Sequence, residues 1–342
     1  MKYQYENTKL CVPPIEWNKN SGKEILQYAV GSLLYMPATK LEIAGKIIRG
    51  DYPHLKAMTL CLEDSIGDAM VEKAEQSVRE IAKQLKRAIE DGKLDVNNLP
   101  LIFIRVREVG HMTRLAQLLG HRMSVITGFV IPKFDKTNCK AYRDEFMAIA
   151  KKLPDKLYMM PIIESKNAMY TELRHENLMY INECIKPISD YILNIRVGAA
   201  DFCQLYGIRR GITNTLHDIR VVSDCLTDIM NVFGRNYVVS SGVWEYFGGE
   251  WEVGLRRELQ ADRLNGFIGK TSIHPVQLPV IQESLIVTKE EYEDARSILN
   301  MSTDLVGVIK GHGGNKMNEA KTHTAWAKKI IGLAGVYGVK EV

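Results

Sequence analysis

Residues 266–277 read Gly-Phe-Ile-Gly-Lys-Thr-Ser-Ile-His-Pro-Val-Gln, a short apolar run that ends in Gly269-Lys270 before a turn at a proline. Seven similar runs precede it, each followed by a longer segment with helical periodicity. Repeated strand–helix units of this kind predict a parallel sheet, and eight of them close a (β/α)₈ barrel, the TIM barrel. The eight predicted strands are Val30–Met36, Ala57–Leu62, Leu101–Val106, Gly128–Pro132, Leu157–Ile163, Tyr191–Gly198, Tyr237–Ser240 and Gly266–Lys270.

The segments between the predicted strands carry the period of amphipathic helices. Apolar residues recur every three or four positions over residues 71–89 and again over 219–233. This spacing places them on one face of a helix, where they pack against the sheet. The fold class that follows is an α/β barrel covered by helices.

Three regions follow from this pattern. We expect an N-terminal extension over residues 1–29, the barrel over 30–288, and a helical appendage over 289–342. The appendage is predicted to hinge on a flexible Gly-rich linker, Gly307–Asn315, and to end in an amphipathic helix over 318–335.

Composition and charge exclude several classes of protein. The chain has 342 residues, with 45 Lys and Arg against 41 Asp and Glu, a balance too even to indicate binding of nucleic acid. No apolar run approaches the roughly 18 residues of a membrane span. The six cysteines include no CxxC pair, which favours reduced thiols and a cytoplasmic location.

Charged residues gather where the predicted strands end. In a barrel of this type the active site lies at the C-terminal ends of the strands. Four carboxylates at one mouth repel one another, and a divalent cation together with nearby Arg and Lys side chains would relieve that repulsion. The residues in question are Glu63, Asp64, Arg105, Arg107, Lys133, Glu164, Asp201 and Lys270.

The ligand types indicate which metal is expected. Carboxylates without His or Cys neighbours are hard oxygen ligands, which suit Mg²⁺. No HxH or HExxH pair is present, so zinc is not expected. The sequence also lacks a GxSxG nucleophile motif, a P-loop and the setting of a nucleotide-binding glycine motif.

Together these stretches resemble the HpcH/HpaI aldolase–citrate lyase superfamily, closest to its citrate lyase beta subunit and malyl-CoA lyase branch. The likeness spans about residues 30–300, and the run at 266–277 matches the family's GFxGKxxIHPxQ closely. The other four motifs are shorter but stand in the family's order: Ser32–Pro37, Cys61–Ile66, Ile104–Arg107, and Ile162–Ser165 paired with Gly198–Asp201.

The resemblance implies roles for individual residues. Glu164 and Asp201 match the pair that holds Mg²⁺ in such lyases, Arg105 matches the arginine that grips the substrate carboxylate and enolate oxygen, and Asp64 matches an aspartate beside the metal. Arg107 stands where the family has asparagine. This departure suggests a divergent branch, and we associate it with stress-response and tellurite-resistance gene clusters.

The predicted function is a Mg²⁺-dependent carbon–carbon lyase that works by retro-aldol or retro-Claisen cleavage. Glu63 or Asp64 would move a proton, and the sequence does not choose between them. Lys133 and Arg107, with Lys270, would bind further anionic groups of a small carboxylate, acyl thioester or phosphorylated substrate. A condensing synthase, a thioester hydrolase and a non-catalytic barrel that serves as a binding module remain alternatives.

Family members also suggest an assembly. Their C-terminal appendage covers the site of a neighbouring subunit and supplies an aspartate, and Glu319 stands at the matching place here. We therefore predict a homo-oligomer, a trimer or hexamer, with Glu319 near another chain's site. A helix that closes the bottom of its own barrel is the alternative.

Overall fold

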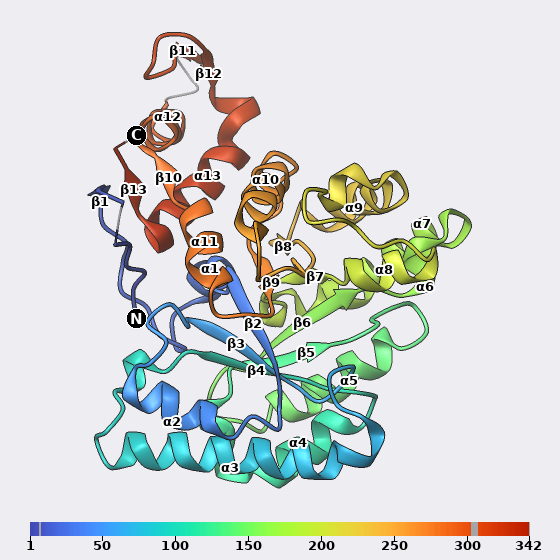
Figure 1. The fold of residues 1–342 in the computed structure, drawn as a ribbon. Coiled ribbons are helices and arrows are strands. Elements are labelled where there is room, and N and C mark those ends of the chain that lie inside the picture. The colour runs from blue at the N-terminus through green and yellow to red at the C-terminus, as the bar shows by residue number, and fades with distance from the viewer. Residues whose placement is uncertain (7, 302–306, 342) are drawn as a thin grey trace.

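The computed structural model describes residues 1–6, 8–301 and 307–341. Its centre is a sheet of eight parallel strands in the order β8-β7-β6-β5-β4-β3-β2-β9. A parallel bridge from Ser241, just after β8, to Lys270 in β9 closes the circle, which confirms the predicted barrel (Figure 1). The strands are β2 (Ser32–Pro37), β3 (Ala57–Cys61), β4 (Leu101–Arg105), β5 (Gly128–Ile131), β6 (Tyr158–Ile163), β7 (Ile195–Val197), β8 (Val239–Ser240) and β9 (Lys270–Ser272).

Helices follow the strands and cover the outside of the barrel. The periodic segments form helices as predicted, and the apolar positions Val78, Ile81 and Leu85 are buried along one of them. The covering helices are α2 (Glu42–Arg49), α3 (Val71–Glu90), α4 (His111–Leu119), α5 (Cys139–Ala150), α6 (Lys166–Met169), α7 (Thr171–Ile185), α8 (Ala199–Leu205), α9 (Arg220–Phe233), α10 (Trp251–Leu264) and α11 (Gln277–Ser284).

Alternation along each strand divides the core in two. In β2 and β3, for example, Leu33 and Ala57 belong to a cluster inside the barrel, whereas Leu34 and Met58 pack outward against the helices. Because both faces of a parallel sheet of this kind are covered, the strands read as nearly continuous apolar runs. The apolar runs from which the strands were predicted therefore reflect burial on both faces of the sheet.

The bottom of the barrel, where the strands begin, is closed by both ends of the chain. Helix α1 (Lys23–Ala29) packs against α13 (Ala320–Tyr337), and Tyr337 donates a hydrogen bond to the Tyr28 carbonyl at 2.7 Å. Strand β13 (Val339–Lys340) lies between β1 (Leu10–Val12) and β10 (Val287–Thr288). The terminal helix therefore packs on its own chain.

The Gly-rich segment, predicted to be a flexible linker, lies in a hairpin in the structure. Strands β11 (Val308–Lys310) and β12 (Met317–Glu319) pair antiparallel. Asp294 on α12 (Lys289–Leu299) fixes them, because its buried carboxylate accepts hydrogen bonds from the backbone N–H of His312 and the Asn318 amide. Residues 302–306, which the predicted appendage also includes, lie outside the described residues.

The eighth strand begins later than predicted, and its side chains are shifted as a result. Gly269 adopts a φ of +78° and lies so close to Gly31 that a Cβ would sit 2.4 Å from the Gly31 carbonyl oxygen. This local turn of the backbone lets Ile268 and then Thr271 face the barrel interior, and Lys270 points outward toward α10.

Within the described ranges, no helix is long and apolar enough to cross a membrane.

Candidate functional site

Arg105, at the end of β4, joins three of the predicted carboxylates at the mouth of the barrel. Its Nη2 lies 2.8 Å from Glu63 Oε2, 3.3 Å from Asp64 Oδ2 and 2.9 Å from Glu164 Oε1. Glu63 and Asp64 follow β3, and Glu164 follows β6. The structure thus brings together side chains that are separated by up to about a hundred residues in the sequence, as the strand-end argument predicted.

Lys133 adds a second cation from the end of β5. Its ammonium contacts the Glu63 carboxylate and lies 3.1 Å from Asp64 Oδ1. Its backbone has a φ of 48°, a left-handed conformation that costs free energy for a residue with a Cβ. The backbone N–H donates to Glu164 Oε1 at 2.9 Å, and Asn138 bonds the carbonyl, so neighbouring groups hold this strained turn in place.

Glu164 and Asp201 meet on the other side of the mouth. The Glu164 carboxylate packs so tightly on Gly198 that a Cβ there would lie 2.0 Å from Oε2, and α8, which carries Asp201, begins at the next residue. Burial raises the pKa of Glu164 to about 8 against the opposing Arg105 charge, and the Asp201 charge adds to the increase. Burial and then the Asp64 charge raise the pKa of Asp201.

The two neighbouring carboxylates after β3 differ in environment. Glu63 is buried, and burial raises its pKa despite the Arg105 charge. The Asp64 side chain is 53% exposed; although partial burial acts against it, the hydrogen bond with Glu63 and the charges of Arg105 and Lys133 lower its pKa. Asp64 is therefore the ionised group that reaches solvent, whereas Glu63 is the buried carboxylate that pairs with Arg105 and Lys133.

Two of the predicted site residues have other partners. Arg107 donates to the backbone carbonyls of Leu62 and Ile66 and pairs with Asp68, so it fastens the loop after β3. Lys270 has no exposed surface, because its side chain points outward from the barrel and its ammonium pairs with acidic side chains of α10. Neither the Arg107 guanidinium nor the Lys270 ammonium joins the cluster around Arg105.

Glu319 ends strand β12 of the hairpin and is not among the carboxylates that contact Arg105. It precedes α13, its backbone N–H donates to His323 Nδ1 at 3.0 Å, and its carboxylate accepts from Thr322 at 3.2 Å. Its predicted position near a second chain stays a prediction.

Sequence reasoning missed Arg196, in the middle of β7. This guanidinium is 1% exposed and faces the inside of the barrel, with its Cζ atom 5.9 Å from the centre of the Tyr35 ring. A signal was present, since Arg196 is a charge inside the otherwise apolar run Ile195–Val197. The strand-end argument considered only charges that follow strands and therefore passed over it.

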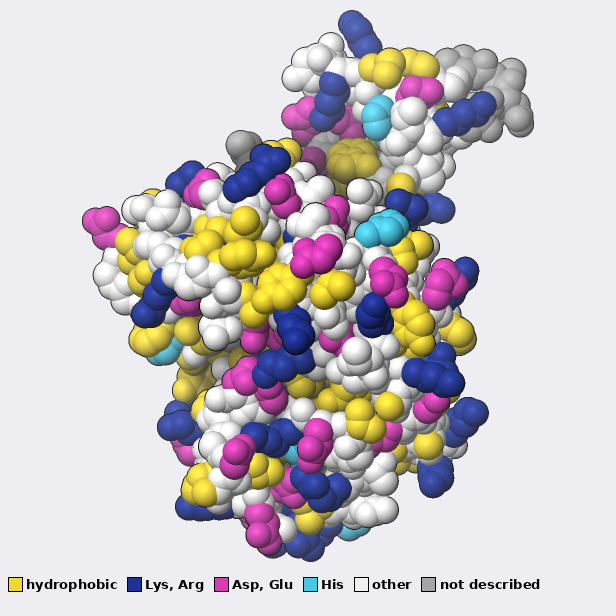
Figure 2. Space-filling model, turned by 90° about the vertical axis from the view of Figure 1, so that its right-hand side faces the viewer, with side chains coloured by type: hydrophobic (Ala, Val, Ile, Leu, Met, Phe, Trp, Pro, Cys, Tyr) yellow, Lys and Arg dark blue, Asp and Glu magenta, His cyan; other side chains and the backbone are white. Residues whose placement is uncertain are grey.

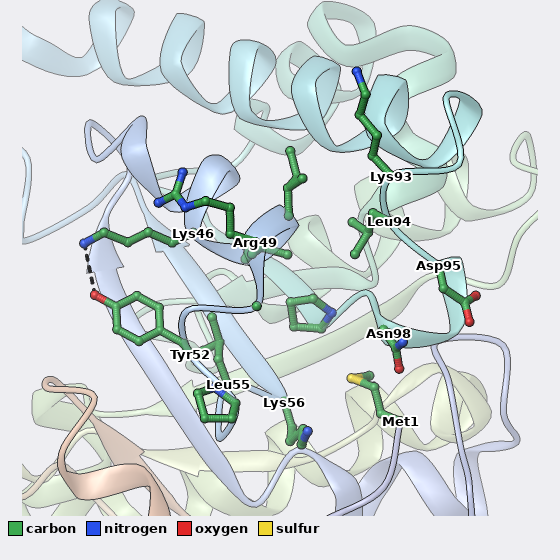
Figure 3. A pocket seen from close by; sticks show the side chains of 15 residues that line it. Met1, Lys46, Arg49, Tyr52, Leu55, Lys56, Lys93, Leu94, Asp95 and Asn98 are labelled. Atoms are coloured by element: carbon green, nitrogen blue, oxygen red, sulfur yellow. Dashed lines mark hydrogen bonds between the residues drawn. The ribbon is translucent and has the colours of Figure 1, made fainter.

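A basic cavity of about 330 Å³ lies at the bottom of the barrel, between the loops that lead into β3 and β4. Figure 3 shows Lys46 and Arg49 on its rim, with Lys46 hydrogen-bonded to Tyr52 at 3.0 Å; Arg49 pairs with Asp51. Because chemistry in such barrels takes place at the other end, we do not include this cavity in the site.

Comparison with known proteins identifies the family of the chain. A model of a family described as C–C bond lyases of the TIM-barrel fold matches residues 24–339. The chain belongs to this family of carbon–carbon bond lyases. The match confirms the superfamily resemblance seen in the sequence, and the association with tellurite-resistance clusters stays a prediction. No curated protein matches the chain.

Solved structures with the same fold include relatives of citrate lyase. The CitE protein of Mycobacterium tuberculosis, in complex with magnesium, acetoacetate and coenzyme A, is similar with a TM-score of 0.57 and 18% identity over 90% of this chain and 99% of that one. RipC from Yersinia pestis has a TM-score of 0.51 and 18% identity over 75% and 95%. The M. tuberculosis citrate lyase beta subunit with oxaloacetate and magnesium reaches 0.50 and 16% over 76% and 98%.

The mouth of the barrel has the donor set that Mg²⁺ prefers. Four carboxylates face two cations there, and burial raises the pKa values of Glu63, Glu164 and Asp201, an effect that a bound divalent cation would oppose. Glu164 Oε1 is bonded to Arg105 and Lys133, whereas its Oε2 is turned toward Gly198 and the start of α8. Within the described residues, no group of three or more His, Cys, Asp or Glu is arranged to hold a metal, and Mg²⁺ needs only one or two protein carboxylates plus water and substrate oxygens.

The outer surface of the protein mixes charge types. On the face shown in Figure 2, cationic, acidic and hydrophobic side chains alternate over short distances among the described residues. Surfaces that bind nucleic acid carry broad positive patches, and the expectation that this chain binds none stays a prediction.

Proposed function

We propose that this protein is a Mg²⁺-dependent lyase that cleaves a carbon–carbon bond of a small hydroxy acid or its acyl thioester. The observation that carries the proposal is the joining of Arg105 to Glu63, Asp64 and Glu164 at the ends of three strands, with Asp201 beside them. Membership of the lyase family, and the magnesium and small 3-oxo acids bound by CitE and citrate lyase beta subunit, support it.

Glu164 and Asp201 would hold the metal. A bound Mg²⁺ would act as a Lewis acid toward a substrate oxygen and as a template that fixes the substrate carboxylate. The close packing of Glu164 against Gly198 holds this carboxylate in one place, which is what an ordered ligand requires.

Arg105 receives the substrate's negative charge. Its Nη2 makes all three carboxylate contacts, whereas its buried Nε has no hydrogen-bond partner in the described part of the chain. A donor that is preorganised and buried stabilises charge as it develops, because no solvent needs to reorganise. This N–H would bind the oxygen that becomes negative as the carbon–carbon bond breaks.

Asp64 accepts the proton that the cleavage releases. In a retro-aldol step the base removes the hydroxyl proton, the C–O bond becomes a carbonyl, and the electrons of the broken C–C bond form an enolate, which is then protonated. Asp64 is ionised and half exposed, as this role requires. Lys133, held between Asp64 and Glu63, positions the base and binds a second anionic group of the substrate.

The test is a panel of 3-hydroxy acids and their CoA thioesters, incubated with purified protein and Mg²⁺ and assayed for both cleavage products by mass spectrometry. We expect the two fragments of a C–C cleavage in equal amounts and no products with chelator present. Release of free CoA without C–C cleavage would instead assign a thioester hydrolase, and joining of the fragments alone a condensing synthase. Binding without any turnover across the panel would contradict the proposal.

A further inference from the structure

Arg196 is a buried cation without a counterion. Its side chain lies inside the barrel, and its Nη2 donates to the Thr271 hydroxyl at 2.7 Å. Its Nε and Nη1 have no hydrogen-bond partner among the described residues, and no described carboxylate lies within the 4.0 Å of an ion pair. Among the described residues, the neutral Thr271 hydroxyl and the nearby Tyr35 side chain are therefore what the protein offers to a group with five N–H donors.

Such an arrangement is unfavourable for the protein by itself. An arginine stays charged in proteins, so it cannot escape burial by losing its proton. A buried charge that lacks a partner is destabilising, and interior layers of these barrels are ordinarily filled by branched apolar side chains. The buried guanidinium of Arg196 therefore lowers the stability of the protein, and packing alone does not explain its presence.

The position of Arg196 connects it to the proposed site. It lies on β7 two residues before Gly198, on which the Glu164 carboxylate packs. Tyr35 lies beside Arg196, with its ring 5.9 Å from the guanidinium; burial raises the pKa of Tyr35, and the charges of Arg196 and Arg105 oppose that increase. Tyr35 is only partly buried, whereas Arg196 is 1% exposed, so Tyr35 is the more accessible of the two neighbours.

Other groups at this depth also lack acceptors. The Thr59 hydroxyl, in β3 and in register with Tyr35, is buried without a partner in the described ranges, as is Arg105 Nε. The buried Asn194 amide likewise has no partner in the described residues, and the free guanidinium N–H groups of Arg196 and Arg105 are donors only. A small anion satisfies such a set, because carboxylate oxygens only accept hydrogen bonds.

We propose that Arg196 is a specificity-determining residue that binds a second carboxylate of the substrate, with the Tyr35 ring turning aside to admit it. This inference rests on the proposed function in one respect, namely that the substrate enters at the mouth lined by Arg105. It assigns to this chain a preference for small dicarboxylates over monocarboxylates. The second carboxylate neutralises the buried guanidinium, and the paired contact discriminates against ligands that lack it.

The experiment compares the binding of unreactive acids, so that it does not depend on turnover. Calorimetry with Mg²⁺ measures the affinity of full-length protein for acetate and butyrate and for malonate, succinate and glutarate. We expect the best dicarboxylate to bind roughly tenfold or more tightly than the monocarboxylates, the usual size of a charge-assisted contact. Arg196→Met should remove that preference and leave monocarboxylate affinity within about twofold, and Arg79→Met on the exposed face of α3 is the matched control.

Stability provides an independent readout. Since Arg196→Met removes an uncompensated buried charge, the unfolding temperature without ligand should stay equal or rise, and dicarboxylates should stabilise wild type much more than the variant. Arg196→Lys should keep part of the preference, and it replaces the methionine variant if that one does not fold. A wild type without any preference for dicarboxylates, or a preference that survives in both variants, overturns the proposal. Absence of lyase activity alone leaves this comparison intact and refutes only the proposed function.

Discussion

Replacing Gly198 by alanine should disable the mouth of the barrel while leaving the protein folded, because this glycine leaves room for the Glu164 side chain. A Cβ at residue 198 would lie 2.0 Å from Glu164 Oε2 and 2.4 Å from Glu164 Cβ, whereas ordinary contact begins at 3.4 Å. The Glu164 Cβ is attached directly to the backbone, so it cannot swing aside as the end of a flexible side chain could. Glu164 as a whole must therefore move away by about 1 Å, which is the shortfall at its Cβ.

A movement of this size removes what Glu164 holds. Its Oε1 accepts from Arg105 Nη2 and from the Lys133 backbone N–H, both at 2.9 Å, and a further ångström takes both contacts outside hydrogen-bond range. Overpacking of this kind costs about 1–3 kcal/mol of stability. Misplacement of a reacting group by about 1 Å costs on the order of 10²-fold in rate, so activity should fall far more than stability.

The assay measures stability, metal binding and turnover on the same preparations. Urea unfolding followed by circular dichroism gives stability, calorimetry gives Mg²⁺ affinity, and the substrate panel gives the rate. Gly67→Ala is the matched control, since its backbone has an ordinary φ of −66° and no atom lies within 4 Å of the added Cβ. A Gly198→Ala protein that keeps wild-type Mg²⁺ affinity and rate would refute the reasoning.

Four further outcomes are expected. Glu164→Gln and Asp201→Asn should each weaken Mg²⁺ binding in calorimetry with little loss of folding, and wild-type affinity in both would contradict their role as ligands. Arg105→Lys should lower ligand affinity at least about tenfold and spare Mg²⁺ binding, because lysine cannot copy a bidentate contact. Deletion of residues 307–342 should lower the unfolding temperature by exposing α1, and light scattering on full-length and truncated protein tests the predicted trimer or hexamer. Burial acts to raise the pKa of Asp262, but the Lys270 ammonium and the His217 ring lower it. The stabilisation that Asp262 provides is therefore complete above the ordinary pKa of an aspartate and is lost as the pH falls through the lowered value. Asp262→Asn should reduce stability at pH 7 and weaken this loss of stability in acid, as measured by urea titrations at several pH values.

The barrel and most of its mouth were predictable from the sequence because both follow from local rules. Eight apolar runs gave the strands, and the charges that follow them had to meet, since the C-terminal ends of barrel strands converge. Glu63, Asp64, Arg105, Lys133 and Glu164 come together as this rule requires. Their metal-binding and catalytic roles remain predictions.

The exceptions depend on backbone geometry and tertiary contacts that sequence spacing does not reveal. The positive φ at Gly269 turns Lys270 away from the mouth. The hairpin in the Gly-rich segment depends on a distant carboxylate, that of Asp294, rather than on its own composition. Arg196 was missed because the strand-end argument considered only charges that follow strands, and the significance of a charge within a strand emerges only from the partners that it lacks.

The small sheet that joins the two ends of the chain has a consequence for biosynthesis. Strand β1, which holds residues 10–12, pairs with β13, which holds residues 339–340. At about 5–20 residues per second, a ribosome would need on the order of 20–60 seconds to deliver the second partner after the first. During this interval the bottom of the barrel stays open, with Tyr3 and Leu26 exposed that are later buried. A nascent chain of this protein should therefore depend on chaperones until its last helix has emerged.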